Sequence, residues 1–297
     1  MRVSSNQYQN TALSGIISAY QRMGDASSKL STGKQIGTPS DDPSGTAQAL
    51  TIQNHLDNLD QTKRTLNSAK SILAASDAAL ESVSDILRQG RTLAVQGGST
   101  NITAEERASL AQQVTSLIQT LGNQGNASLG NRYLFAGQRN DKAPFQANQG
   151  SFTYQGGLAG GADGDIRLDI STQESLIVNT TGDRAIVPAL KALEQLRDNL
   201  SNGNIDATST ESIKQFDTEI QNLSTIRAGI GSKINNVDRI LNQNTTIKVN
   251  FTQALSDIED TDIPKTVVQY QSAQLAYQAA LQSTSRIGQL SLLDFLK

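Results

Sequence analysis

The strongest constraint on the fold is an apolar residue at every seventh position over two long stretches. The stretch from Ile52 to Leu87 keeps this spacing without interruption, and the stretch from Leu223 to Ile258 keeps it with one amide, Asn244. With its flanks each series covers about 50 residues, which predicts a helix roughly 75 Å long at 1.5 Å rise per residue. Together they predict a mainly α fold, a long antiparallel coiled-coil-like helical bundle formed by the N- and C-terminal halves. The predicted shaft core is Ile52, Leu59, Leu66, Leu73, Leu80, Leu87, Leu223, Ile230, Val237, Phe251 and Ile258.

Recognisable start signals precede the predicted helices of this shaft. Asp42 followed by Pro43 has the form of an N-cap and a first helical residue, so the first long helix should begin there. Thr103 and Glu106 have the spacing of a capping box, which should start a helix that folds back on the first. We therefore interpret Asp42 as a helix cap rather than as part of a catalytic carboxylate pair.

The second long helix contains residues that disfavour helix. Thr208 and Glu211 form another capping box, which should launch it. Gly229 and Gly231 each cost about 1 kcal/mol inside a helix, so they mark a bend or a close contact. We expect the helix to continue through both glycines and to end or kink at Pro264.

Asn244 allows two interpretations. It is either a tolerated surface amide near the edge of the seam, or a buried amide that fixes the register of the bundle at a cost in stability. If it fixes register, Asn244→Leu should raise thermal stability and impair assembly. Normal assembly by that variant would exclude the second interpretation.

The middle of the chain changes from helical to alternating periodicity. Phe152 and Tyr154 alternate with polar residues, and a glycine-rich run with an Asp163-Gly164 turn signal follows. This predicts a small β-rich insertion that projects outward. The predicted divisions are terminal helices at 1–43 and 264–297, a helical shaft at 44–137 and 183–263, and the insertion at 138–182.

The apolar series at the two chain ends are weaker than those of the shaft. Ser27 interrupts the first, and Gln274 and Thr284 interrupt the second. A helix of about 25 residues with a broken seam buries little apolar area and is marginal in water. We therefore expect both ends to be disordered until they fold against each other and against neighbouring subunits. The predicted assembly seams are Leu13, Ile16, Tyr20, Met23 and Leu30 at the N-terminus, and Val267, Tyr270, Tyr277, Leu281 and Leu292 at the C-terminus.

Composition argues against several classes of function. The net charge is -3, and Lys and Arg are scattered, which argues against binding to nucleic acid or to an anionic membrane. The chain has no cysteine, and its one histidine, His55, lies within a predicted helix. No metal-binding or nucleotide-binding motif is present. We expect no catalytic residue, no metal and no cofactor.

Five segments carry a resemblance to a known family. They are the opening MRVSS, LSTGKQIGTPSDDPSG at 30–45, NRYLFAG at 131–137, IRAGIG at 226–231 and SDIEDTD at 256–262. With them the chain resembles the flagellin superfamily and, within it, the proteins of the hook–filament junction. Filament flagellins typically read DDAAG where this chain has DDPSG at 41–45, and they end in a proline-containing tail that this chain lacks.

The resemblance implies a structural component of the bacterial flagellum outside the cell. It implies export through the flagellar type III apparatus without a cleaved signal peptide, and a chaperone that binds the C-terminal region. The implied partners are hook-associated protein 1, flagellin and a ring of identical subunits. The terminal helices would then form the axial core.

Three other functions remain as alternatives. A filament-forming flagellin would polymerise into long filaments by itself. A type III secretion coiled-coil tip protein would not need the paired terminal motifs. An enzyme would need a convergent set of catalytic residue types, which the sequence does not offer.

Overall fold

The structure is a computed structural model that describes residues 2–158, 160–161, 163–169 and 175–295, without the side chains of 2–6, 8–9 and 286–295. The chain divides into two compact units. Unit 1 comprises Met1–Leu59 and Thr246–Lys297, and unit 2 comprises Asp60–Thr245. The predicted divisions at residues 43 and 264 lie elsewhere, because both long helices contribute residues to each unit.

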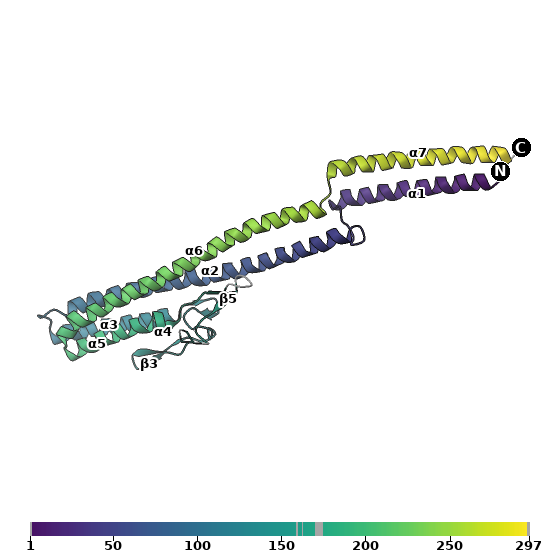
Figure 1. The fold of residues 1–297 in the computed structure, drawn as a ribbon. Helices are drawn as coiled ribbons and strands as arrows, with labels where there is room; N and C mark the ends of the chain where they lie inside the picture. The colour runs from purple at the N-terminus through teal and green to yellow at the C-terminus, as the bar shows by residue number, and fades with distance from the viewer. Residues whose placement is uncertain (1, 159, 162, 170–174, 296–297) are drawn as a thin grey trace. The chain divides into compact units, whose positions relative to one another are not determined.

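In its described part the chain forms seven α-helices, one short π-helix and three antiparallel β-hairpins (Figure 1). The predicted mainly α fold with a small β region is therefore confirmed. No described helix is long and apolar enough to cross a membrane. The helices are α1 (Arg2–Thr32), α2 (Pro43–Gly97), α3 (Ala104–Gly125), α4 (Gly182–Ala185), α5 (Val187–Asn202), the π-helix η1 (Ala207–Ser212), α6 (Ile213–Glu259) and α7 (Ile263–Phe295). The strands are β1 (Ser128–Leu129), β2 (Arg132–Tyr133), β3 (Phe145–Asn148), β4 (Ser151–Tyr154), β5 (Arg167–Asp169) and β6 (Ser175–Ile177).

Unit 2 has one continuous apolar core, to which α2, α3, α5 and α6 contribute. Its largest side chains with less than 2% exposure include Phe135, Phe216, Leu193 and Leu196. Seven of the predicted shaft-core residues belong to it and are buried, namely Leu66, Leu73, Leu80, Leu87, Leu223, Ile230 and Val237. The remaining four, Ile52, Leu59, Phe251 and Ile258, belong to unit 1 and are only half-buried.

Ion pairs fix the direction of α2 against α6. Lys70 pairs with Asp238 at 2.6 Å, and Arg91 pairs with Asp217 at 2.6 Å. As the residue number rises along α2 it falls along α6, so the two helices are antiparallel. This confirms the predicted orientation of the bundle.

The helix start signals were right in two cases and wrong in one. The Asp42 carboxylate accepts hydrogen bonds from the backbone N–H groups of Ser44 and Gly45 at 3.0 and 2.9 Å, which caps α2. Thr103 and Glu106 form the expected capping box of α3. The capping box expected from Thr208 does not form, because its hydroxyl donates to the Asn204 carbonyl within a π-helical turn instead.

The β region begins earlier than predicted, at Ser128 rather than at residue 138. The hairpin of β3 and β4 turns at Gln149 and Gly150, both with positive φ. Asp163 and Gly164 form a turn, as predicted, and it lies between β4 and β5, which do not pair. Gly122 of α3 lets the hairpin approach, since a Cβ there would lie 2.3 Å from the Phe152 ring.

Candidate assembly surface

Small residues form the contact between the two terminal helices, α1 and α7. Ala19 and Ala26 of α1 are 2% and 6% exposed, and Thr266 and Ala273 of α7 are 4% and 8% exposed. Half-buried larger residues, such as Met23, alternate with them. Figure 1 shows the helices side by side with the chain termini at the same end, so they run antiparallel.

Two tyrosines meet across this pair. The Tyr20 and Tyr277 rings lie 5.9 Å apart between centroids. Alanine and threonine at the buried positions let the helix backbones approach closely over the described part of the pair.

The predicted seams lie partly to one side of this contact. Of the predicted residues, Ile16, Met23, Leu30, Tyr270 and Tyr277 are half-buried. Leu13, Tyr20, Val267 and Leu281 are instead between 36% and 60% exposed. The side chain of Leu292 lies outside the described residues.

Sequence reasoning missed the alanines because it searched for large apolar residues. The contact follows the spacing of four and three at 12, 16, 19, 23, 26 and 30 of α1, and at 266, 270, 273, 277, 280 and 284 of α7. Counting alanine and threonine as seam residues would have revealed it. The larger side chains remain on the adjoining face.

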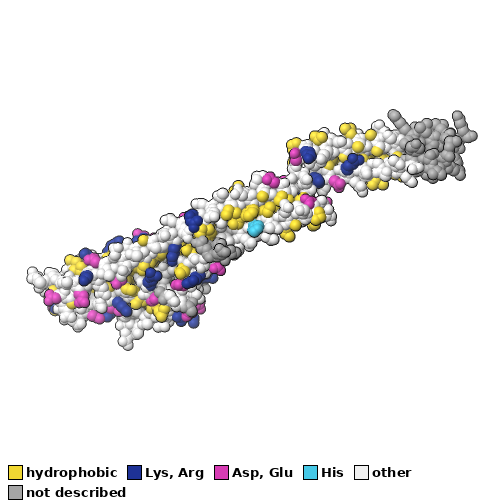
Figure 2. All heavy atoms as spheres, in the orientation of Figure 1, with side chains coloured by type: hydrophobic (Ala, Val, Ile, Leu, Met, Phe, Trp, Pro, Cys, Tyr) yellow, Lys and Arg dark blue, Asp and Glu magenta, His cyan; other side chains and the backbone are white. Residues whose placement is uncertain are grey.

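Large apolar side chains of α1 and α7 outside this contact are exposed, and we call this set of residues the terminal apolar face (Figure 2). Its residues are more than a third exposed although they are large and apolar. Clusters of exposed apolar side chains mark protein interaction sites in soluble proteins. The terminal apolar face comprises Leu13, Ile17, Tyr20, Val267, Val268, Leu275 and Leu281.

Backbone hydrogen bonds tie the two linkers of unit 1 to each other. The Gln35 N–H donates to the Glu259 carbonyl at 2.6 Å, and the Thr261 N–H donates to the Gly33 carbonyl at 2.9 Å. The Lys34 ammonium pairs with the Glu259 carboxylate at 2.5 Å, which raises the pKa of Lys34. The linker after α1 is therefore joined to the linker before α7.

A carboxylate organises the rest of the first linker. Asp41 accepts hydrogen bonds from the N–H groups of Thr38 and Gly37 at 2.8 and 3.1 Å, and these bonds lower its pKa. Gly45 lies against this turn, because a Cβ there would be 2.7 Å from Ile36 and 2.5 Å from Asp42. The LSTGKQIGTPSDDPSG segment thus folds as a defined turn.

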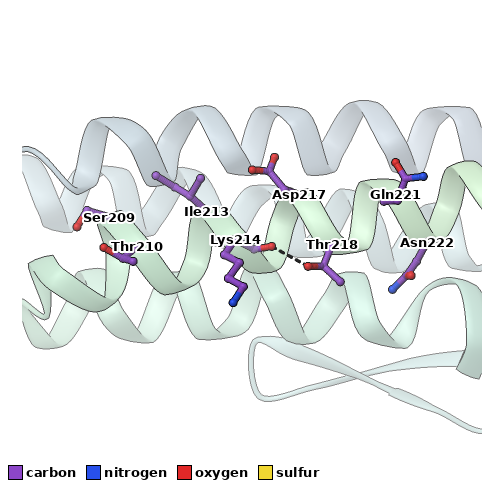
Figure 3. Close-up of a pocket in the computed structure, with 8 residues that line it drawn as sticks. All are labelled: Ser209, Thr210, Ile213, Lys214, Asp217, Thr218, Gln221 and Asn222. Carbon is purple, nitrogen blue, oxygen red and sulfur yellow. Dashed lines mark hydrogen bonds between the residues drawn. The ribbon is translucent and has the colours of Figure 1, made fainter.

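The described residues offer no catalytic arrangement. His55 is exposed and stacks on Phe251, with centroids 5.3 Å apart and an interplanar angle of 5°. No group of three or more His, Cys, Asp or Glu among the described residues could hold a metal ion. The open groove in Figure 3 is lined mostly by hydroxyl and amide side chains at the start of α6, and its carboxylate, Asp217, is held by Arg91.

Asn244 lies in the part of α6 that belongs to unit 2. The residue is half-buried, and its Nδ2 atom is buried with no hydrogen-bond partner among the described residues. An unpaired buried amide costs stability. That cost is the one expected of a buried amide that fixes register, and the predicted effect of Asn244→Leu remains to be measured.

The chain matches two family models and is similar to several curated proteins. Residues 3–140 match the bacterial flagellin N-terminal helical region, and residues 213–296 match the bacterial flagellin C-terminal helical region. The flagellar hook-associated protein 3 of Escherichia coli (strain K12) is 24% identical, with 100% of both chains covered. The protein of the same name from Salmonella typhimurium is 21% identical over 98% of each chain. A flagellin of Listeria innocua is 24% identical over 90% of this chain and 88% of its own.

Solved structures share the fold. A putative flagellar hook-associated protein from Vibrio parahaemolyticus has a TM-score of 0.66 at 19% identity, covering 74% of this chain and 100% of its own. Hook-associated protein-3 from Legionella pneumophila has a TM-score of 0.61 at 13% identity, covering 70% of this chain and 98% of its own.

Proposed function

The chain belongs to the flagellin family, whose members are structural components of the flagellum, and from this premise we propose that it is a junction adaptor. In this role it connects hook-associated protein 1 to the flagellin filament. The observation that carries the proposal is the terminal apolar face, which lies on a helix pair whose buried apolar residues are alanines. Similarity over the full chain to hook-associated protein 3 of Escherichia coli supports the junction rather than the filament.

Assembly would complete the packing that unit 1 lacks. The α1–α7 contact buries mainly alanine, which gains little free energy per residue on leaving water. Neighbouring subunits that cover Tyr20 and Leu275 would add larger apolar area to the same pair. Folding of the terminal helices is therefore coupled to polymerisation in this mechanism.

The same features account for the other expected partners. A ring of identical subunits presents one terminal apolar face per copy to hook-associated protein 1 on one side and to flagellin on the other. Before assembly, Val268 and Leu275 of α7 are exposed, and an export chaperone at the C-terminal region would shield them. The chain would act outside the cell after export without a cleaved signal peptide.

Electron microscopy of a deletion strain tests the junction role. We expect hooks that carry no filament, with flagellin lost to the medium, and rescue by the unmodified chain. Leu275→Ser should fail to rescue, because it places a polar group in the terminal apolar face, whereas Leu158→Ser on exposed unit 2 surface should rescue. Normal filaments in the deletion strain would refute the proposal.

A filament-forming flagellin is the second candidate, favoured by the similarity to flagellins over about nine tenths of the chain. The two functions differ in what the purified chain does by itself. A flagellin polymerises into long filaments when seeded, and a junction adaptor stops at short rings. Long filaments of the pure chain would favour this alternative.

Hydrogen exchange on the monomer tests coupled folding. Amides of α1 and α7 should exchange much faster than those of α2 and α6 within unit 2, and assembly should protect them. Slow exchange at both ends of the free monomer would contradict the mechanism.

A further inference from the structure

A cavity of about 370 Å³ in unit 2 has no role in the assembly described above. It lies between the segment after β6, helix α4 and the middle of α6. Its volume is within the range of small-molecule sites. Ile177, Ile226 and Ile230 give it apolar walls, and charged and hydroxyl groups complete the lining.

A helical glycine forms part of the cavity wall. Gly229 lies within the continuous helix α6 and lines the cavity, and a Cβ at this position would meet nothing within 4 Å. The close contact that would explain a glycine here is therefore absent from the described residues. The open space at this position leaves room for a group from outside the chain.

Two cations border the same space. Lys233 of α6 is half-buried, and Arg184 of α4 lies close enough to act on it electrostatically. Burial, followed by the charge of Arg184, lowers the pKa of Lys233. Among the described residues, neither cation has a hydrogen-bond or salt-bridge partner. An anion between them would relieve their mutual repulsion.

A threonine hydroxyl supplies a third hydrogen-bonding group beside the two cations. Thr181 is only 3% exposed and lines the cavity, and its hydroxyl has no hydrogen-bond partner in the described part of the chain. This hydroxyl is therefore free to bond to a molecule in the cavity. Asp165 also lines the cavity and offsets one of the two positive charges, which leaves a net charge of one.

We propose that this cavity binds a carboxylate group, held by Lys233 and Arg184 and by the Thr181 hydroxyl. A singly charged anion matches the net charge, whereas a doubly charged phosphate exceeds it. Arginine pairs with a carboxylate through two parallel hydrogen bonds, and lysine adds a third charged donor. The carboxylate comes either from a free small acid or from an acidic side chain of a second copy of this chain.

Acetate is the probe for a free acid. The full chain with ¹³C-methylated lysines is titrated with sodium acetate at constant ionic strength, with chloride as the balancing ion and NMR as the readout. The Lys233 signal should shift saturably and its pKa should rise, while the signal of exposed Lys214 should not change. Arg184→Met should weaken binding about 10-fold, the typical effect of losing a charged hydrogen bond.

Gly229→Leu separates binding from folding. Leucine is the better helix former and meets no atom at its Cβ, so this variant should fold at least as well as the parent. Its side chain fills the cavity, so the acetate response of Lys233 should be lost. An unchanged acetate response in this variant would contradict the proposal.

Sedimentation tests the second source of the carboxylate. If an acidic side chain of a second copy occupies the cavity, Lys233→Met should weaken self-association of the chain and Lys214→Met should not. The proposal is overturned if acetate leaves the Lys233 signal unmoved and Lys233→Met leaves self-association unchanged. Tighter binding of inorganic phosphate than of acetate would overturn the choice of a carboxylate. None of these outcomes depends on the junction role.

Discussion

Units 1 and 2 are built from similar helical sequence but bury very different side chains. In unit 2 the buried residues include phenylalanine, leucine and isoleucine from four helices. In the described part of unit 1 the buried apolar residues are Ala19, Ala26, Ala49, Ala273 and Leu56, so all but one are alanine. Most of the large exposed apolar side chains belong to unit 1.

The difference shows that one chain can bury large apolar side chains in one unit and leave them exposed in another. Heptad spacing is present in both units, so periodicity alone does not decide which is stable. The apolar area that each repeat removes from water decides it. Unit 2 completes its core within one chain, whereas the described part of unit 1 leaves many of its large apolar side chains exposed.

The largest expected effect is on the core of unit 2. Phe216 is fully buried and packs beside Gly90, so Phe216→Ala should destabilise unit 2 by about 3–5 kcal/mol. Leu275→Ala in unit 1 removes an exposed side chain and should change monomer stability by less than about 0.5 kcal/mol. Urea unfolding of both variants would measure the contrast, and equal losses would abolish the distinction between the units.

A smaller effect is expected from enlarging the alanine contact. Ala26→Leu should force α1 and α7 apart, at a cost of about 1–3 kcal/mol to their pairing. Filament attachment should fail, while the urea transition of unit 2 stays unchanged. Ser28→Leu, which adds the same side chain at an exposed position of α1, is the matched control. Normal attachment with Ala26→Leu would show that close approach of the helices is dispensable.

Glycines should respond oppositely in the two units. Gly122→Ala places a Cβ 2.3 Å from the Phe152 ring and should destabilise unit 2 by about 1–2 kcal/mol. Gly24 of α1 has nothing within 4 Å of an added Cβ, so Gly24→Ala should raise helix stability by up to about 1 kcal/mol. Thermal unfolding checks the first variant, and circular dichroism of the monomer checks the second.

The smallest effect concerns the ion pair between the linkers. Lys34 is half-exposed, so Lys34→Met should cost less than about 1 kcal/mol, and the loss should shrink in high salt. The pKa of Lys34 is raised in the folded chain. The ion pair therefore contributes its full stabilising free energy below the ordinary lysine pKa, and this contribution is lost as the pH rises through the pKa of Lys34 in the folded state. Hydrogen-exchange rates of the Gln35 and Thr261 amides would measure the loss of stability in Lys34→Met, with Lys63→Met as the control.

Sequence reasoning predicted the long helices, their antiparallel arrangement and two of three helix starts, because heptad spacing and capping chemistry are local signals. It misjudged Thr208, whose hydroxyl serves a π-helical turn, since nothing in a four-residue pattern distinguishes the two uses. It misplaced the β region because two-residue strands such as β1 have no alternation to detect. The seam at Ala19 and Ala26 was missed because small residues carry little hydrophobic signal.

The cross-tied linkers also have a mechanical consequence. A pull on α1 is not carried by the 33–42 linker alone, because two backbone hydrogen bonds and the Lys34–Glu259 pair pass part of it to the chain entering α7. The bonds join segments that are distant in sequence and would have to break together before either linker could extend. A force applied to one terminal helix is therefore transmitted to both linkers through these bonds.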